Sequence, residues 1–312
     1  MRRVLVIGDV MLDHYIEGDA SRLSGEAPVP VVSVERDRFV LGGAANVAAN
    51  IVALGGEAIL LGAVGDDWAG RELKILAEQA DIDGSFILTD GDRRTTEKCR
   101  IMSGRHQVAR YDREDLFPLS PKLVEECVDA MEALRGTLDA VVVSDYAKGM
   151  VTADILNVGR CLEGIPIIVD PKQAGYERYC PVGAVIKPNR LEAESEASLK
   201  IEDEASALLA AQRLQMRLRA HAVYVTLGEV GGALCAEGGI HKIIPGETVA
   251  VSDPTGAGDA VAAALALSLG SGVSVEEAAY WANHVASRSV TMPGTSVVRM
   301  GAPAQMLDRN LP

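Results

Sequence analysis

The chain has 312 residues, of which 48% are hydrophobic and only 4% are aromatic. This length and composition allow one large α/β domain whose core is built mainly from aliphatic side chains. The formal net charge of −14 argues against nucleic acid or an anionic membrane as the main partner. An anionic ligand would therefore need local cations at its binding site.

The cysteines and the first residues bear on location. The five cysteines are scattered without CxxC spacing, which predicts reduced thiols in a cytoplasmic protein and no zinc site. The first apolar run, residues 4–7, is broken by Asp9, so we expect a strand there and no signal peptide. No apolar stretch reaches the roughly 18 residues that a membrane-spanning helix needs.

Short apolar runs end in polar residues, as buried strands of a parallel sheet do at the edge where ligands bind. These runs are residues 4–7, 140–143, 165–169, 184–186 and 223–225. Helical periods lie at residues 44–54, 67–79, 121–134, 153–162, 202–219 and 275–290. The alternation predicts a doubly wound, mostly parallel α/β sheet flanked by helices, in a single domain over residues 1–312.

Two stretches do not follow this rhythm. Residues 13–38 and 95–112 alternate between polar and apolar side chains, which predicts antiparallel strands outside the main sheet. Together they would form a small lid, and its exposed edge is a natural place for a homodimer contact. The alternative is a pair of surface hairpins without such a role.

The segment Asp253-Pro254-Thr255-Gly256-Ala257-Gly258-Asp259 precedes an Ala-rich apolar run, residues 260–269, that is expected to be a helix. Bare N–H groups in a small, glycine-containing first turn can converge on an anion. We expect Thr255 to cap the helix. A carboxylate at Asp259, beside such an anion site, suits proton removal from an alcohol that attacks a phosphoryl group. The alternative is a tight turn that merely caps a buried helix.

A second glycine segment, Gly42-Gly43-Ala44-Ala45-Asn46, opens the helix expected at residues 44–54. Two glycines allow a ligand to approach the backbone closely. Asn46 offers a donor and an acceptor to a ligand rich in hydroxyl groups. The alternative is a tight strand-to-helix connection with an incidental asparagine.

These two segments resemble the two signatures of the ribokinase-like (PfkB) carbohydrate kinases, in the right order and near opposite ends of the chain. The resemblance covers nearly the whole sequence and implies a ribokinase-like fold and ATP-dependent phosphorylation of a sugar. A Rossmann dehydrogenase is a poorer match, because the first strand is followed by Gly8-Asp9-Val10-Met11 and no glycine fingerprint. A non-catalytic sugar-binding protein on the same fold is a further alternative.

A narrower resemblance is to the kinases that phosphorylate D-glycero-D-manno-heptose 7-phosphate at the C1 hydroxyl, for ADP-heptose and lipopolysaccharide core synthesis. It is carried by residues 8–13, 21–31, 144–149, 170–172, 177–179 and 294–296. Some members carry a fused adenylyltransferase, and this sequence shows no such segment, so we expect a stand-alone kinase. The alternative within the family is a ribokinase- or fructokinase-type enzyme for another sugar or sugar phosphate.

The resemblance also implies roles for individual residues. Asp259 would be the catalytic base, ionised and weakly basic because it lies at a positive helix end. Backbone N–H groups of Gly256, Ala257 and Gly258 would hold the γ-phosphoryl group. The sugar phosphate would be bound by Asp13, Gly42, Gly43, Asn46, Arg110 and Lys172, with Lys98 and Arg105 as further lid cations.

On the nucleotide side, the resemblance implies Asn189, Glu192, Thr226, Gly228 and Asn283. Glu192 would act on Mg²⁺ through water, since Mg²⁺ keeps much of its hydration shell. The alternative for Glu192 is an ordinary acidic residue in the first turn of a helix. Activation by a monovalent cation such as K⁺ is a further implication of the family, and the expected partners are ATP and a small sugar phosphate.

Overall fold

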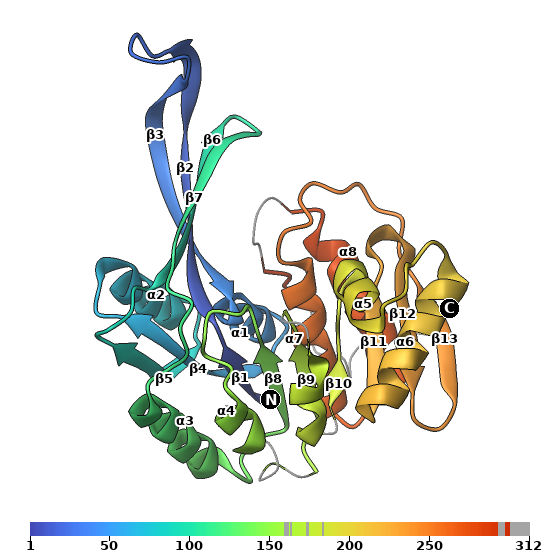
Figure 1. Ribbon diagram of the computed structural model, residues 1–312. Helices are drawn as coiled ribbons and strands as arrows, with labels where there is room; N and C mark the ends of the chain where they lie inside the picture. The colour runs from blue at the N-terminus through green and yellow to red at the C-terminus, as the bar shows by residue number, and fades with distance from the viewer. Residues whose placement is uncertain (159–161, 163, 173–174, 183, 293–296, 300–312) are drawn as a thin grey trace.

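The computed structural model describes the chain except for residues 159–161, 163, 173–174, 183, 293–296 and 300–312. The motif at residues 294–296 therefore lies outside the described residues. Figure 1 shows a main sheet with helices on both of its faces and a second, smaller sheet that projects away from it.

Within the described residues the main sheet has nine strands in the order β13-β12-β11-β10-β9-β8-β1-β4-β5. They are β1 (Arg3–Gly8), β4 (Glu57–Gly65), β5 (Asp83–Asp90), β8 (Ala140–Ser144), β9 (Ile167–Asp170), β10 (Val185–Ile186), β11 (Ala222–Thr226), β12 (Gly231–Ala236) and β13 (Ile240–Pro245). Neighbours from β5 to β11 are parallel, and β12 and β13 are antiparallel. The predicted mostly parallel α/β sheet is confirmed. The sequence patterns did not single out β4, β5, β12 or β13.

Two layers of helices cover this sheet. One face carries α1 (Ala44–Ala53), α2 (Trp68–Gln79), α7 (Ala257–Gly270) and α8 (Val275–Ser289). The other carries α3 (Pro121–Leu134), α4 (Ala153–Val158), α5 (Arg190–Ala197) and α6 (Glu204–Leu218). Short 3₁₀ turns, η2 (Tyr176–Val182) and η3 (Gly228–Val230), complete the elements. In β1, Val4 and Val6 enter the first core while Leu5 and Ile7 enter the second, because side chains alternate between the faces of a strand.

The small side chains of α7 explain its central position. Every residue from Asp259 to Ser268 is buried, and α7 packs against both α1 and α8. An Ala-rich helix allows such close neighbours on all sides. The first turn of α7 is thereby carried into the middle of the molecule, at the edge where the parallel strands end.

The second sheet consists, in the described part of the chain, of four strands in the order β3-β2-β6-β7. They are β2 (Val10–Leu23), β3 (Pro30–Gly43), β6 (Thr96–Ser103) and β7 (His106–Arg113). The sequence placed these strands within residues 13–38 and 95–112, but β2 and β3 reach further, down to the main sheet. The expectation of purely antiparallel strands is wrong, because β2 and β6 pair in parallel.

Two expectations on cysteines and membranes can be compared with the structure. Cys99, Cys127 and Cys235 are free and buried. Cys161 lies outside the described residues, as does the side chain of Cys180. Among the helices that the structure describes, none is both long and apolar enough to cross a bilayer.

Candidate active site

Asp259 lies in the first turn of α7, and both of its carboxylate oxygens accept hydrogen bonds from distant parts of the chain. Its Oδ2 accepts from Nδ2 of Asn46 in α1, and its Oδ1 accepts from the hydroxyl of Tyr146, each at 2.6 Å. Only 5% of Asp259 is exposed. Tyr146 follows β8, so three separate segments fix the orientation of one carboxylate.

The helix cap differs from the expectation. Gly256, and not Thr255, is the N-cap residue of α7, with a φ of 82° and no side-chain cap. This left-handed conformation favours glycine because a Cβ would be strained there. A cap without a side-chain acceptor leaves N–H groups of the first turn available for a ligand. The N–H of Ala257 donates to the carbonyl of Pro254 at 3.3 Å, so this donor is partly engaged.

The electrostatics of Asp259 also differ from the expectation. Burial raises the pKa of Asp259 above the usual range of an aspartic acid, while the hydrogen bonds from Tyr146 and Asn46 act in the opposite direction. The sequence argument considered only the helix end and predicted a weak base. Removal of the carboxylate from water outweighs the helix end, and a raised pKa makes Asp259 a stronger base nearer neutral pH.

A second buried carboxylate, Asp9, builds the loop that carries Tyr146. Its Oδ2 accepts from the backbone N–H of Tyr146 at 2.7 Å and of Lys148 at 3.1 Å, and its Oδ1 accepts from the N–H of Met150 at 3.0 Å. The carbonyl of Asp9 also accepts the first N–H of α1, from Ala44, at 3.0 Å. Asp9 therefore ties the loop after β8 to the start of α1, and both of these segments hold Asp259.

Asp13 and the glycines before α1 form a wall next to Asp259. Asp13 is buried and pairs with Arg100 of β6 at 2.5 Å. A Cβ on Gly42 would lie 2.7 Å from Oδ2 of Asp13, so this position admits no larger residue without movement. Gly43 has a φ of 56°, which the sharp entry into α1 requires. The structure thus brings Asp13, Gly42, Gly43 and Asn46 together, and their binding of the sugar stays a prediction.

Cations of the second sheet and of the loop after β8 lie near this wall. Lys98 of β6 lies over the ring of Tyr146, with Nζ 5.5 Å from its centroid. Burial lowers the pKa of Lys98, with Arg110 and Lys148 acting in the same direction and Asp13 opposing them.

Arg110 is paired with Asp112 at 2.5 Å, and Lys148 with Glu114 at 2.7 Å. Lys98, Arg110 and Lys148 form what we call the cation cluster; Arg105 lies in the β6–β7 turn at the far end of the hairpin.

A cavity of about 220 Å³, which we call the strand-end cavity, lies beside Tyr146 and Gly258, the hydrogen-bond partner and the chain neighbour of Asp259. Its wall is made by Asp145, Tyr146, Asp170, Pro171, Lys172, Lys187, Asn189, Glu192, Thr226 and Gly258. These residues follow β8, β9, β10 and β11 or begin α5 and α7. The carboxyl ends of neighbouring parallel strands therefore meet here, as the sequence predicted.

Lys172 lies in this cavity and not among the substrate-side residues with which it was grouped. Its Nζ is 3.3 Å from Oε1 of Glu192. The other oxygen of Glu192 accepts from the backbone N–H of Asn189 at 2.9 Å, and Asn189 caps α5 in return. Glu192 thus takes part in a capping box in the first turn of α5, and its Oε1 faces Lys172 in the cavity. In the described residues no group of three or more His, Cys, Asp or Glu is arranged to hold a metal.

The remaining nucleotide-side residues separate into two groups. Thr226 ends β11 and lines the strand-end cavity, and Gly228 follows it with a φ of 65°. Asn283 is different, because its side chain is fully used inside the protein. Its Oδ1 accepts from the hydroxyl of Tyr224 at 2.5 Å, and its Nδ2 donates to the carbonyls of Ile244 and Pro245 at 3.1 Å. This side chain joins α8 to β11 and β13.

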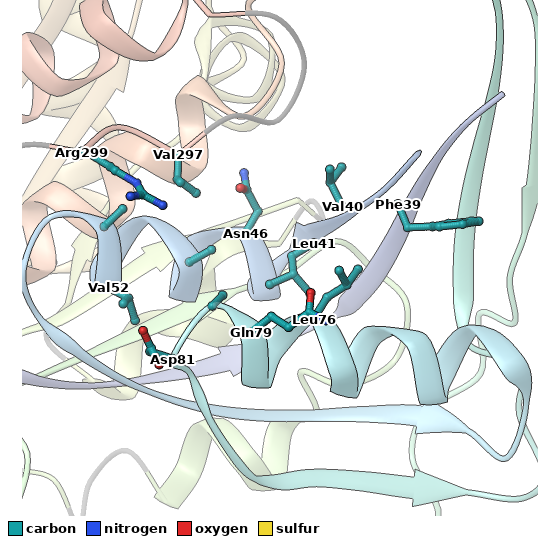
Figure 2. A pocket seen from close by; sticks show the side chains of 13 residues that line it. Phe39, Val40, Leu41, Asn46, Val52, Leu76, Gln79, Asp81, Val297 and Arg299 are labelled. Carbon is teal, nitrogen blue, oxygen red and sulfur yellow. The ribbon is translucent and has the colours of Figure 1, made fainter. Parts of the chain in front are cut away.

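A larger cavity, of about 940 Å³, lies against α1, α2 and the end of β3. Figure 2 shows Val40 and Leu41 of β3, Val52 of α1 and Leu76 of α2 around it. Asn46 is also part of its wall, and Asp259 lines neither this cavity nor the strand-end cavity. Its lining is mainly aliphatic and lacks the convergent polar groups of the strand-end cavity, so size alone does not identify the reaction site.

Tyr146, Asp170 and Lys187 were not singled out as site residues from the sequence, although each follows a predicted strand. The signal was present, because a polar residue just past a buried strand marks the ligand edge. Sequence position does not say which of several consecutive side chains turns toward the site. Only the hydrogen bonds of Asp9 and the pairing of the strands decide this.

Comparison with known proteins agrees with this geometry. The profile of the pfkB family carbohydrate kinases matches residues 1–299. The chain belongs to the PfkB family of carbohydrate kinases. Such an enzyme transfers a phosphoryl group from ATP to a sugar hydroxyl, and this chain is an ATP-dependent sugar kinase.

Relatives and solved structures extend this result. Proteins named "Bifunctional protein HldE" from Caulobacter sp. (strain K31) and Caulobacter vibrioides are 43% and 41% identical to this PfkB kinase over 95% of its length. The chain spans about three fifths of those relatives, 60% and 62% of their lengths. Escherichia coli phosphofructokinase-2 in complex with potassium has a TM-score of 0.77 at 19% identity, covering 98% of this chain and 97% of that one.

Arabidopsis thaliana ribokinase complexed with ribose and ATP has a TM-score of 0.74 at 21% identity, with 98% and 97% of the two chains covered. At such identities these two structures establish the ribokinase-like fold alone.

The hydrogen bond from Tyr146 to Asp259 leads to a prediction about pH. We expect Asp259 to act as a base, and a base must be unprotonated to act, so activity should be lost as the pH falls through the pKa of Asp259. The bond stabilises the charged carboxylate, so Tyr146→Phe should raise this pKa further and move the acidic limb of the kcat/KM profile to higher pH. The same profile measured on Tyr280→Phe, in α8, is the control. An unchanged acidic limb in Tyr146→Phe would contradict the role of this hydrogen bond.

Proposed function

We propose that this kinase transfers the γ-phosphoryl group of ATP to the C1 hydroxyl of D-glycero-D-manno-heptose 7-phosphate. The product, heptose 1,7-bisphosphate, would serve ADP-heptose and lipopolysaccharide core synthesis in the cytoplasm. The observation that carries the proposal is the position of Asp259, a buried carboxylate whose partner Tyr146 lies under Lys98 of the cation cluster and lines the strand-end cavity. The motifs resembling heptose 7-phosphate kinases and the HldE relatives support this choice of sugar.

The reaction follows from this position. A C1 hydroxyl between Asp259 and the cavity would lose its proton to the carboxylate as its oxygen attacks the γ-phosphorus. The N–H groups at the start of α7 would bind the phosphoryl oxygens, on which negative charge is concentrated. Asp13 and Asn46 would orient the sugar hydroxyls. Such a reaction depends mostly on positioning, which the hydrogen bonds to Asp259 provide in advance.

ATP would occupy the strand-end cavity and the surface beyond it, near Asn189, Thr226 and Gly228. Mg²⁺ would be held through water by Glu192, which lines the strand-end cavity together with the carboxylates of Asp145 and Asp170. Lys172, now 3.3 Å from Oε1 of Glu192, would then pair with a phosphate instead. Mg²⁺ supplies positive charge to the phosphates when bound. A monovalent cation such as K⁺ is proposed as a further activator, by analogy with the potassium complex of the phosphofructokinase-2 noted above.

A panel of sugars tests the proposed substrate. ADP release should show the highest kcat/KM with heptose 7-phosphate and lower values with ribose, fructose, fructose 6-phosphate and unphosphorylated heptose.

Asp259→Asn should lower kcat by about 10²–10⁴-fold while the protein stays folded, because it loses the base and keeps the shape. A preference for an unphosphorylated sugar would contradict the proposed substrate, and near-normal turnover by Asp259→Asn would contradict the base.

The cation cluster should bind the 7-phosphate, because it supplies positive charge in a chain of charge −14. A hydrogen bond to a charged group contributes about 1.5–3 kcal/mol, or roughly 10–100-fold in affinity. Lys98→Met should therefore raise the KM for heptose 7-phosphate by about this factor and leave the KM for ATP unchanged. Arg105→Met, in the distant hairpin turn, is the matched control. Equal effects of the two variants would show that general charge, and not this cluster, is responsible.

We further propose that the second sheet mediates a homodimer. Leu23, Val29 and Val34 of the long β2–β3 hairpin are at least half exposed, at 70%, 50% and 55%. Figure 1 shows this hairpin projecting from the body of the molecule, where a second copy can reach it. Sedimentation equilibrium should give a dimer for the native chain and a monomer for Val34→Lys, since a buried charge opposes association. A monomeric native chain would exclude this contact.

A further inference from the structure

Lys187 is a buried lysine at the end of β10 that neither the motifs nor the family comparison assigned. It pairs with Asp170, at the end of β9, with 2.9 Å between Nζ and Oδ1. The side chain of Lys187 is only 3% exposed and that of Asp170 15%. The backbone N–H of Lys187 donates to the carbonyl of Val169 at 2.8 Å, so the strand pairing fixes the root of the side chain.

The ammonium group of Lys187 faces the start of α7. A Cβ on Gly258 would lie 3.4 Å from Nζ of Lys187 and 3.9 Å from Oδ2 of Asp170. Lys187 and Gly258 both line the strand-end cavity. The cation is therefore beside the first turn of α7, where the cap leaves N–H groups for an anion although that of Ala257 is partly engaged.

Folding stability alone does not explain the buried ion pair of Lys187 and Asp170. Taking two charges out of water costs several kcal/mol per ion, and apolar residues in their place are often as stable. The lysine is also outnumbered, because Asp170, Asp259 and Glu192 all act electrostatically on this region. Burial raises the pKa of Asp170 to about 6 in spite of the adjacent lysine. Several carboxylates surround one buried ammonium group here, and that ammonium group faces a turn that can bind an anion. This arrangement suits a lysine that acts on a phosphate.

We propose that Lys187 is a catalytic residue whose ammonium group contacts the γ-phosphoryl oxygens during transfer, with Asp170 holding it in position beforehand. The sugar oxygen forms its bond to phosphorus as the bond to the β–γ bridging oxygen breaks, and ADP keeps that electron pair. The hydroxyl proton goes to Asp259. Lys187 keeps its own proton throughout and stabilises charge only. The inference rests on the sugar-kinase reaction and not on the identity of the sugar.

The first experiment compares the native enzyme with Lys187→Met, which keeps length and removes charge. With the best sugar from the panel, kcat should fall about 10²–10³-fold, as for other groups that stabilise transition-state charge. The KM for the sugar should change little. Lys200→Met, an exposed lysine with 77% of its side chain accessible, is the control and should retain native kcat. A native kcat in Lys187→Met would overturn the proposal.

The second experiment separates a catalytic role from simple neutralisation of Asp170. The double variant Asp170→Asn/Lys187→Met removes both buried charges, so it should fold even if Lys187→Met does not. A catalytic lysine leaves the double variant with the same low kcat. Recovery of native kcat in the double variant would show that Lys187 only neutralises Asp170, and it would overturn the proposal.

The third experiment needs no sugar and is independent of the proposed substrate. Calorimetry with Mg²⁺ measures the affinity of the double variant for ADP and for AMP-PNP, a non-hydrolysable analogue that carries a γ-phosphoryl group. Affinity for AMP-PNP should fall at least tenfold relative to the native chain, while affinity for ADP stays within about twofold. Equal losses for the two nucleotides would place Lys187 away from the γ-phosphoryl group and contradict the proposal.

Discussion

The hydrogen bonds that Asn46 and Tyr146 donate to Asp259 are the interaction on which the rest of the site depends. Each donor comes from a different segment, and each segment is positioned by Asp9 at the end of β1. A carboxylate with 5% exposure would be costly without such partners. Because the partners come from the fold itself, the carboxylate is oriented before any ligand binds.

Burial of three carboxylates in and near the candidate site has a cost in folding stability. Burial raises the pKa values of Asp9, Asp170 and Asp259. A carboxyl group whose pKa is raised on folding favours the folded state at low pH and loses that contribution as the pH rises through the raised value. At neutral pH these three groups therefore oppose folding. The two aliphatic cores, one on each face of the sheet, must offset that opposition.

The two sheets have different parts in the site. The main sheet brings the ends of β8, β9, β10 and β11 together around the strand-end cavity, while the second sheet brings Lys98 over Tyr146. The cation cluster lies where the main sheet and the second sheet meet, in a chain whose formal net charge is −14. In the proposed reaction, the phosphorylated sugar would lie toward the second sheet and ATP toward the strand-end cavity.

The sequence by itself determined the α/β class, the alternation of strands and helices, the second sheet and the glycine turn that leads to Asp259. These features follow from local periodicity and from backbone conformations that favour glycine. Tertiary structure alone decided that Asn46 and Tyr146 hold Asp259, that Lys172 lies beside Glu192, and that Asn283 is used internally. Local sequence also suggested Thr255 as the cap and a weakly basic Asp259, and the structure differs on both. The physical reason is that hydrogen bonds and burial depend on residues more than 100 positions apart, such as Tyr146 and Asp259, which no local pattern relates.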